Sequence, residues 1–253
     1  MSDTALYMGI DRIVYNSLLS LILNITQLNI DMLEAIISTV DIVLLIIKED
    51  RLCVTLSKRD KEPYANQEAL PGGYIHAQDD RDCLDASVRI LQQKTGLLPP
   101  YLEQLKTFAG AARDPRGWSI SVVYFALVDA DLILSATNPG LMICPVDALR
   151  RLPFDHNEII AAAVDRIRNK SQYSSLPCYL AGETFSLPRL QKIYEACLGE
   201  TLNKVSFRRK MDELGVLEAV AGQTESAGAH RPAQLYRLKS EFKNQLKLLE
   251  RGL

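Results

Sequence analysis

Residues 70–97 have the sequence LPGGYIHAQDDRDCLDASVRILQQKTGL, in which a glycine pair precedes an acidic stretch and an amphipathic segment. Gly72 and Gly73 permit tight backbone geometry and close approach of a ligand. Residues 82–95 repeat their apolar side chains at spacings of four and three, which predicts a helix. Gly96 is expected to end that helix.

Strand-forming segments lie on both sides of this stretch. Residues 40–47 (VDIVLLII) are apolar and rich in β-branched side chains, which predicts a buried strand, and residues 52–57 predict a second. Two more strands are expected at 104–109 and 119–128. Strands combined with a helical segment indicate a mixed α/β domain and exclude an all-helical one.

Charge is unevenly distributed along the 253 residues. Residues 1–149 contain 12 Lys and Arg and 19 Asp and Glu, a net charge of -7, whereas residues 150–253 contain 17 and 12, a net charge of +5. An acidic front and a basic back indicate two modules, of which the basic one faces a polyanion. A solvated helical surface is the alternative, and the charge count alone does not decide between them.

The first 37 residues are expected to form a separate helical segment of undetermined role. Residues 13–30 are rich in Leu and Ile but include three Asn and one Gln, which are costly in lipid, so we expect an amphipathic or buried helix and no membrane span. The five cysteines include no C-x-x-C pair. This pattern predicts neither a disulfide framework nor a zinc site and indicates the reducing cytoplasm.

The basic half predicts three helices and two strands. Helices are expected at 155–170, 186–198 and 203–214, and strands at 216–220 and 234–238 around a polar loop. Asp155, with Glu158 three residues later, is expected to cap the first helix in a capping-box arrangement. The apolar side of the third helix is expected to hold Val205, Phe207, Met211 and Leu214.

The other side of the third helix is basic. A short turn joins the second and third helices, which is the helix-turn-helix layout, and the two strands around a polar loop are typical of a wing. The expected DNA-binding residues are therefore Lys204, Ser206, Arg208, Arg209 and Lys210 on the helix, and His230 and Arg231 in the loop. A solvated helix face is the alternative for the basic run, but the turn, helix and wing together favour DNA.

The stretch 70–97 resembles a Nudix box, whose usual form is G-x5-E-x7-R-E-U-x-E-E-x-G-U with U aliphatic. Gly73 matches the opening glycine and Asp79 stands where the first Glu belongs, with two extra residues before Arg89. The end of the box matches at Arg89, Leu91, Gly96 and Leu97. The resemblance covers about residues 38–150 and implies a Nudix fold, a mixed-sheet α/β/α sandwich.

The box departs from the family where its carboxylates are needed. In Nudix hydrolases the box glutamates hold magnesium or manganese, which require oxygen ligands. Here Ile90, Gln93 and Lys94 replace glutamates. We therefore expect no catalytic residues, no metal and no cofactor. The alternative is an enzyme, an ADP-ribose pyrophosphatase with a relocated metal site, because nearby aspartates could still hold a metal weakly.

A pocket can persist after catalysis is lost. Lys94 could pair with a pyrophosphate, and the arginines suit phosphates, although solvated loop charge is the alternative for them. Tyr124 could stack on a base, although packing in the core is the more common role of an aromatic side chain on a strand. The expected effector-binding residues are Arg59, Gly72, Gly73, Lys94, Arg113, Asp114, Arg116 and Tyr124.

The order of the parts resembles the Nudix-related transcriptional regulators of NAD metabolism, over about residues 38–240. This resemblance implies a Nudix-like domain at 38–150 and a winged helix-turn-helix domain at 151–253. It further implies ADP-ribose or a related nucleotide as effector, double-stranded operator DNA as partner, a homodimer, and repression of NAD synthesis or salvage genes. The remaining alternative is a Nudix-fold interaction scaffold that binds no DNA, and the basic third helix and the wing oppose it.

Overall fold

The computed structural model describes residues 12–31, 36–134, 140–225, 232–243 and 245–249, and it divides the chain into a unit of residues 1–36 and a unit of residues 37–253. The first unit contains α1 (Arg12–Asp31), the helix expected there. Leu18, Leu21 and Leu23 along its middle are more than half exposed, Leu23 by 62%. Within the described residues, α1 and the other helices are all too short or too polar to cross a membrane.

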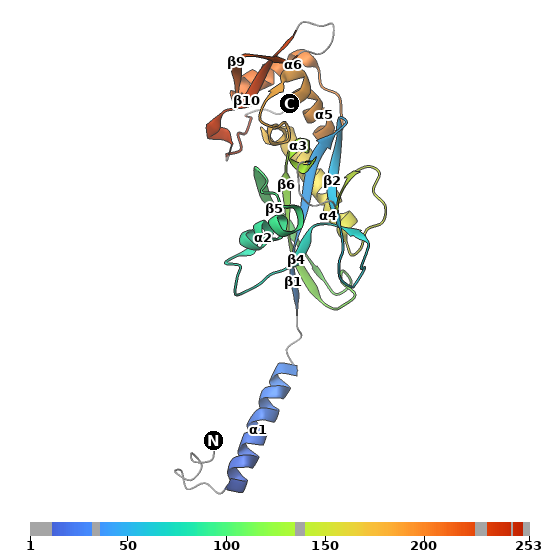
Figure 1. Cartoon of the computed structure of the whole chain (residues 1–253), viewed down its shortest axis with the longest axis vertical. Helices are drawn as coiled ribbons and strands as arrows, with labels where there is room; N and C mark the ends of the chain where they lie inside the picture. The colour runs from blue at the N-terminus through green and yellow to red at the C-terminus, as the bar shows by residue number, and fades with distance from the viewer. Residues whose placement is uncertain (1–11, 32–35, 135–139, 226–231, 244, 250–253) are drawn as a thin grey trace. The chain divides into compact units, whose positions relative to one another are not determined.

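A seven-stranded mixed sheet forms the centre of the second unit (Figure 1). Its order is β3-β2-β1-β6-β5, with β4 also paired to β1 and β7 to β2. β1 runs parallel to β6 and antiparallel to β2 and β4. The strands are β1 (Ile37–Lys48), β2 (Arg51–Lys58), β3 (Glu68–Ala69), β4 (Gly72–Tyr74), β5 (Tyr101–Gly110), β6 (Ser119–Leu127) and β7 (Leu141–Pro145).

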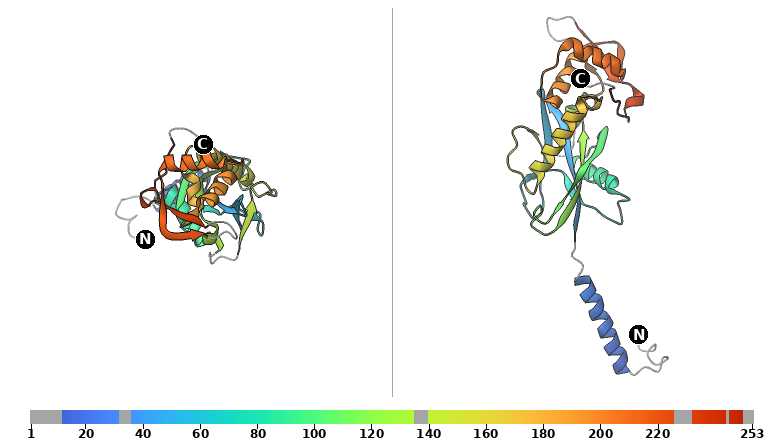
Figure 2. Two further views of the ribbon diagram at one scale, coloured as in Figure 1. Left: turned by 90° about the horizontal axis from the view of Figure 1, so that it is seen from above. Right: turned by 180° about the vertical axis from the view of Figure 1, so that it is seen from behind.

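Helices cover both faces of this sheet, which explains why β1 is apolar at every position from Ile42 to Ile47. Successive side chains of a strand point to opposite faces. Leu45 therefore packs on the side of α4 (His156–Ser171) and Leu44 on the side of α2 (Cys83–Thr95). Figure 2 shows α4, in yellow, lying along the sheet in the right-hand view. A short helix, α3 (Ala130–Leu134), follows β6.

The remaining elements form two helices joined by a turn and followed by a small sheet. They are η1 (Leu176–Leu180), β8 (Phe185–Ser186), α5 (Leu187–Leu198), α6 (Lys204–Leu214), β9 (Leu217–Glu225), β10 (Ala233–Leu238) and η2 (Ser240–Phe242). The small sheet has the order β8-β10-β9. The Asn203 side chain caps α6 by accepting from two backbone N–H groups, and Gly215 ends it in the left-handed conformation.

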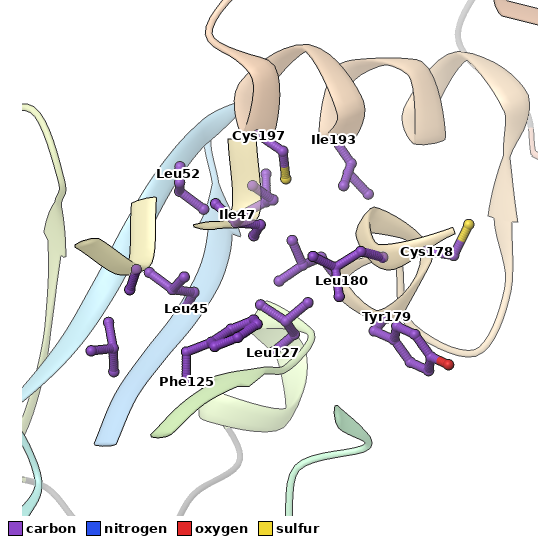
Figure 3. Packing of buried hydrophobic residues seen from close by; sticks show 14 of the residues in the cluster. Leu45, Ile47, Leu52, Phe125, Leu127, Cys178, Tyr179, Leu180, Ile193 and Cys197 are labelled. Atoms are coloured by element: carbon purple, nitrogen blue, oxygen red, sulfur yellow. The ribbon is translucent and has the colours of Figure 1, made fainter. Parts of the chain in front are cut away.

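One hydrophobic core joins the large sheet to these helices. Leu45 and Phe125 on the sheet belong to the same buried cluster as Leu180 of η1 and Ile193 of α5 (Figure 3). The division expected at residues 150 and 151 falls just before α4, and the core is continuous across it. A shared core favours concerted movement of the parts on either side of the division.

Two expectations about the helices are wrong. Asp155 is the N-cap residue of α4, but its side chain makes no capping hydrogen bond, because its carboxylate is bound by Arg113 instead. Val205 is 76% exposed although the pattern placed it on the apolar side of α6. It lies two residues before buried Phe207, and at 3.6 residues per turn two residues rotate a side chain by about 200° around the helix.

Candidate functional site

A cavity of about 300 Å³ lies where β1, β2, β4, α2, the β5–β6 loop and the start of α4 meet. This volume is at the lower end of the range for small-molecule pockets. Its lining contains seven Lys and Arg residues against four Asp and Glu residues, three more positive charges than negative. The cations are Lys58, Arg59, Lys61, Arg89, Lys94, Arg113 and Arg116, and the acids are Asp41, Asp60, Glu62 and Asp114. The excess of positive charge favours an anionic ligand.

The glycine pair lines this cavity and packs closely against its other walls. A Cβ atom built on Gly72 would overlap Oδ1 of Asp41 on the neighbouring strand, and one on Gly73 would lie 3.3 Å from the Ile90 side chain. Glycine is therefore required at position 72 by the approach of a carboxylate from the protein itself. The sequence predicted close approach, but not this partner.

Arg59 and Lys94 both reach the cavity. The Arg59 Nε atom donates to the Pro63 carbonyl at 2.8 Å, and the guanidinium lies 4.8 Å from the centre of the Phe154 ring. Burial and the nearby Arg116 lower the pKa of Arg59. Lys94 Nζ lies 3.6 Å from the Asp60 carboxylate. These cations line one space although they are far apart in the sequence.

The Arg113-Asp114-Pro115-Arg116 loop supplies two arginines in different states. Arg113 is almost buried, and its Nε and Nη2 atoms each donate to Asp155 at 2.9 Å. Arg116 is about one third exposed, donates to Asp114 at 2.6 Å and also contacts the Tyr74 hydroxyl. Arg113 thus links the β5–β6 loop to the start of α4 through Asp155, whereas Arg116 is more exposed at the cavity wall and is more accessible to a ligand.

Of the eight predicted effector-binding residues, Tyr124 alone does not line the cavity. It is 6% exposed and packs with Ile42 and Ile90 on the α2 side of the sheet, and burial raises its pKa. The cavity receives Asp41, which lies on the opposite face of the sheet from Ile42. Strand alternation therefore turns the Tyr124 ring away from the cavity.

Asp41, Phe154 and His156 are among the lining residues that the sequence reasoning missed. His156 is buried, its Nδ1 atom accepts from the Leu70 backbone N–H at 3.1 Å, and burial lowers its pKa. Asp41 Oδ2 accepts from the Ser121 hydroxyl at 2.6 Å. A signal for Asp41 existed, because it is the only charged residue within the apolar run 40–47.

The box arginine, Arg89, pairs with Asp80, the residue that follows the Asp79 of the box match. Arg89 donates to both oxygens of Asp80, at 2.7 and 2.6 Å, and this hydrogen bonding lowers the pKa of Asp80 to about 2. Asp79 is exposed beside His76 instead. Ile90 is buried in the core, and Gln93 lines the cavity. Among the residues the structure describes, no three His, Cys, Asp or Glu side chains are grouped to hold a metal ion.

Helix α6 presents its basic side to solvent. Lys204, Arg208 and Arg209 are exposed and, within the described part of the chain, form no ion pair. Ser206 is exposed as well, whereas Lys210 is half-buried and lies 3.3 Å from Glu213. The opposite side is anchored in the core by Phe207, Met211 and Leu214. His230 and Arg231, predicted in the wing, lie outside the described residues.

Comparison with known proteins relates both parts of the chain to characterised proteins. Residues 177–238 match the family of the NrtR DNA-binding winged helix domain. Over 203 residues, 79% of this chain and 80% of the other, the sequence is 39% identical to the ADPR responsive transcriptional repressor NtrR of Acinetobacter baylyi.

Two solved structures resemble the fold. Shewanella oneidensis NrtR, crystallised with a 27mer DNA, matches with a TM-score of 0.78 and 34% identity, over 85% of this chain and 98% of that one. A MutT/nudix family protein from Enterococcus faecalis matches with a TM-score of 0.62 and 25% identity, over 82% of this chain and 88% of that one. These matches confirm the predicted fold class, a Nudix-type mixed-sheet sandwich with a C-terminal winged helix.

Proposed function

This chain belongs to the NrtR family of transcriptional regulators, and from that premise we propose that it is a DNA-binding repressor whose Nudix-type domain senses ADP-ribose or a related nucleotide. The observation that carries the proposal is the exposed basic side of α6, on which Lys204, Arg208 and Arg209 form no ion pair among the described residues, on a helix anchored by its other side in the core. A surface of this kind is suited to the phosphates and base edges of a DNA major groove.

The proposed DNA contacts divide into two kinds. Arg208 and Arg209 are candidates for bidentate contacts with guanine, each worth about 1–3 kcal/mol of discrimination. Lys204, Ser206 and Lys210, with His230 and Arg231 of the wing, are proposed to contact phosphates and so to add affinity without sequence preference. In a homodimer, two such helices would enter successive major grooves about 34–36 Å apart.

The cavity is the proposed effector site. Arg59, Lys94 and Arg116 supply cations for a pyrophosphate, and Gly72 and Gly73 form a wall without side chains. We include Arg113 and Asp114 as residues that fix the shape of the loop. With Ile90, Gln93 and Lys94 in place of glutamates, the site lacks the ligands on which hydrolysis by a Nudix box depends.

Helix α4 connects the two sites. Its first residue, His156, lines the cavity, and the preceding Asp155 binds the cavity residue Arg113. Near its other end Arg168 donates to the Leu198 carbonyl of α5 at 3.1 Å. A ligand that moves the start of α4 would therefore shift the helices that hold α6. It can change DNA affinity only as far as it binds the two arrangements differently.

DNA binding by the full-length chain to the region upstream of its own gene tests the proposal, with fluorescence anisotropy recorded with and without ADP-ribose. We expect specific binding that ADP-ribose weakens. The double substitution Arg208→Ala/Arg209→Ala should lower specific affinity by about tenfold to a hundredfold or more. Arg150→Ala/Arg151→Ala is the matched control, because it removes the same charge from an exposed arginine pair elsewhere. Equal losses in both double variants, or wild-type affinity in the first, would overturn the assignment of α6.

Hydrolysis is tested separately. The purified chain with magnesium or manganese should not cleave ADP-ribose, because Gln93 offers a neutral oxygen and Lys94 a cation at the metal-binding positions. Release of AMP and ribose phosphate is followed by chromatography. Turnover of about 1 per second or faster, typical of true enzymes, would show that the site is catalytic.

A further inference from the structure

Asp41 and His156 form an end of the cavity that is not suited to phosphate. Both side chains are buried, and both line the cavity. Arg113 lies 3.8 Å from Asp41 but is bound more closely by Asp155, so two carboxylates share one arginine here, and the Asp41 carboxylate would repel a phosphate oxygen placed beside it. A different part of the ligand must therefore occupy this end.

One oxygen of Asp41 is available to a ligand. Oδ2 accepts from Ser121, whereas among the described residues no hydrogen bond reaches Oδ1. Oδ1 lies against Gly72 on one side and 3.8 Å from the His156 Nε2 atom, which is too far for a direct hydrogen bond. Asp41 lines the cavity, and its Oδ1 atom is not among the fully buried side-chain atoms that lack a partner, so a donor on a ligand or water in the cavity can reach it.

His156 offers the complementary group. Because its Nδ1 atom accepts from the Leu70 N–H, the proton of the neutral ring is on Nε2, the nitrogen that faces Asp41. The cavity therefore presents an acceptor and a donor 3.8 Å apart. A single oxygen can lie about 2.8 Å from both, donating to the carboxylate and accepting from the ring. A hydroxyl group can do both, and a phosphate oxygen cannot.

We propose that Asp41 and His156 bind a hydroxyl of the sugar that lies beyond the pyrophosphate, and so select a nucleoside diphosphate sugar over the nucleoside diphosphate alone. The inference rests on the proposed function, in which ADP-ribose is the effector. It adds the residues that recognise the terminal ribose. A site built to bind a hydroxyl discriminates strongly against a ligand that cannot place one there, and ADP has hydroxyls only on the ribose of its nucleoside, not beyond the pyrophosphate.

Calorimetry on the full-length chain tests this with ADP-ribose and ADP as the two ligands. Wild type should prefer ADP-ribose. Asp41→Asn removes the charge of the acceptor, and His156→Asn keeps an acceptor for Leu70 while removing the Nε2 donor. Each substitution should weaken the binding of ADP-ribose by about tenfold to a hundredfold and leave the affinity for ADP unchanged within about twofold.

Ser121→Ala is the control, because it deletes the other partner of Asp41 without changing the cavity lining. It should keep the preference for ADP-ribose. Equal losses for both ligands, or an unchanged ratio in both Asn variants, would overturn the inference while the effector proposal stands. If wild type binds neither ligand, the effector proposal is wrong and this inference falls with it. His156→Asn decides the matter if Asp41→Asn does not fold.

Discussion

Removal of Arg113 should destabilise the chain far more than removal of an ordinary surface arginine. Its guanidinium is 9% exposed and makes two 2.9 Å bonds to Asp155, which is itself only 14% exposed, and it lies 3.8 Å from Asp41. An exposed ion pair contributes about 0–1 kcal/mol, whereas removal of one partner of a buried pair costs about 3–5 kcal/mol. Because both side chains are so little exposed, we expect the larger loss of free energy of unfolding. Arg113→Ala leaves the carboxylates of Asp155 and Asp41 without their cation.

Urea denaturation followed by circular dichroism at pH 7 measures the effect. Arg113→Ala should lower the free energy of unfolding by about 3–5 kcal/mol, out of the 5–15 kcal/mol typical of a domain. Arg51→Ala is the matched control, since Arg51 pairs with Asp147 at the surface, where the two side chains are 50% and 68% exposed. It should cost about 0–1 kcal/mol. A loss below about 1 kcal/mol for Arg113→Ala would refute the argument, because the pair would then behave as a solvated one.

Three further outcomes are expected. Phe207→Ala should lower the free energy of unfolding by about 3–5 kcal/mol, because the ring is 2% exposed and packs edge-on to Tyr194. Val205→Ala, at an exposed position of the same helix, should change it by less than about 0.5 kcal/mol. The reverse order would contradict the buried face of α6. Burial lowers the pKa of His156, so as pH falls the unfolded chain binds a proton on this residue before the folded chain does. Relative to His156→Asn, wild type should lose up to about 1.4 kcal/mol of its free energy of unfolding per pH unit below about pH 6.5. Parallel curves of the free energy of unfolding against pH would contradict this. Deletion of residues 1–36 should leave the free energy of unfolding within about 0.5 kcal/mol of the wild-type value, since both buried clusters lie in the second unit. A larger loss in urea or thermal denaturation would show that the N-terminal unit stabilises the second one.

The sequence by itself determined the elements and the kind of fold. Helices α2, α5 and α6 begin and end within a residue or two of their predicted limits, because caps and apolar periodicity act within a few residues of the chain. The order of the Nudix box and the basic helix also sufficed to predict the fold class, which the comparisons confirm. Seven of the eight predicted effector residues line one cavity, because charged and glycine-rich loops at the ends of strands tend to meet there.

The tertiary structure alone decided which partner each of these side chains meets. Arg113 binds Asp155, 42 residues away, and so removes the predicted side-chain cap, and Arg89 binds Asp80, a pairing that the sequence did not predict. The strand register turns Tyr124 into the core and Asp41 into the cavity. These pairings depend on which strand lies beside which, and on a one-residue alternation that reverses every side chain. Local sequence preferences specify neither, so contacts between distant residues settle the geometry of the site.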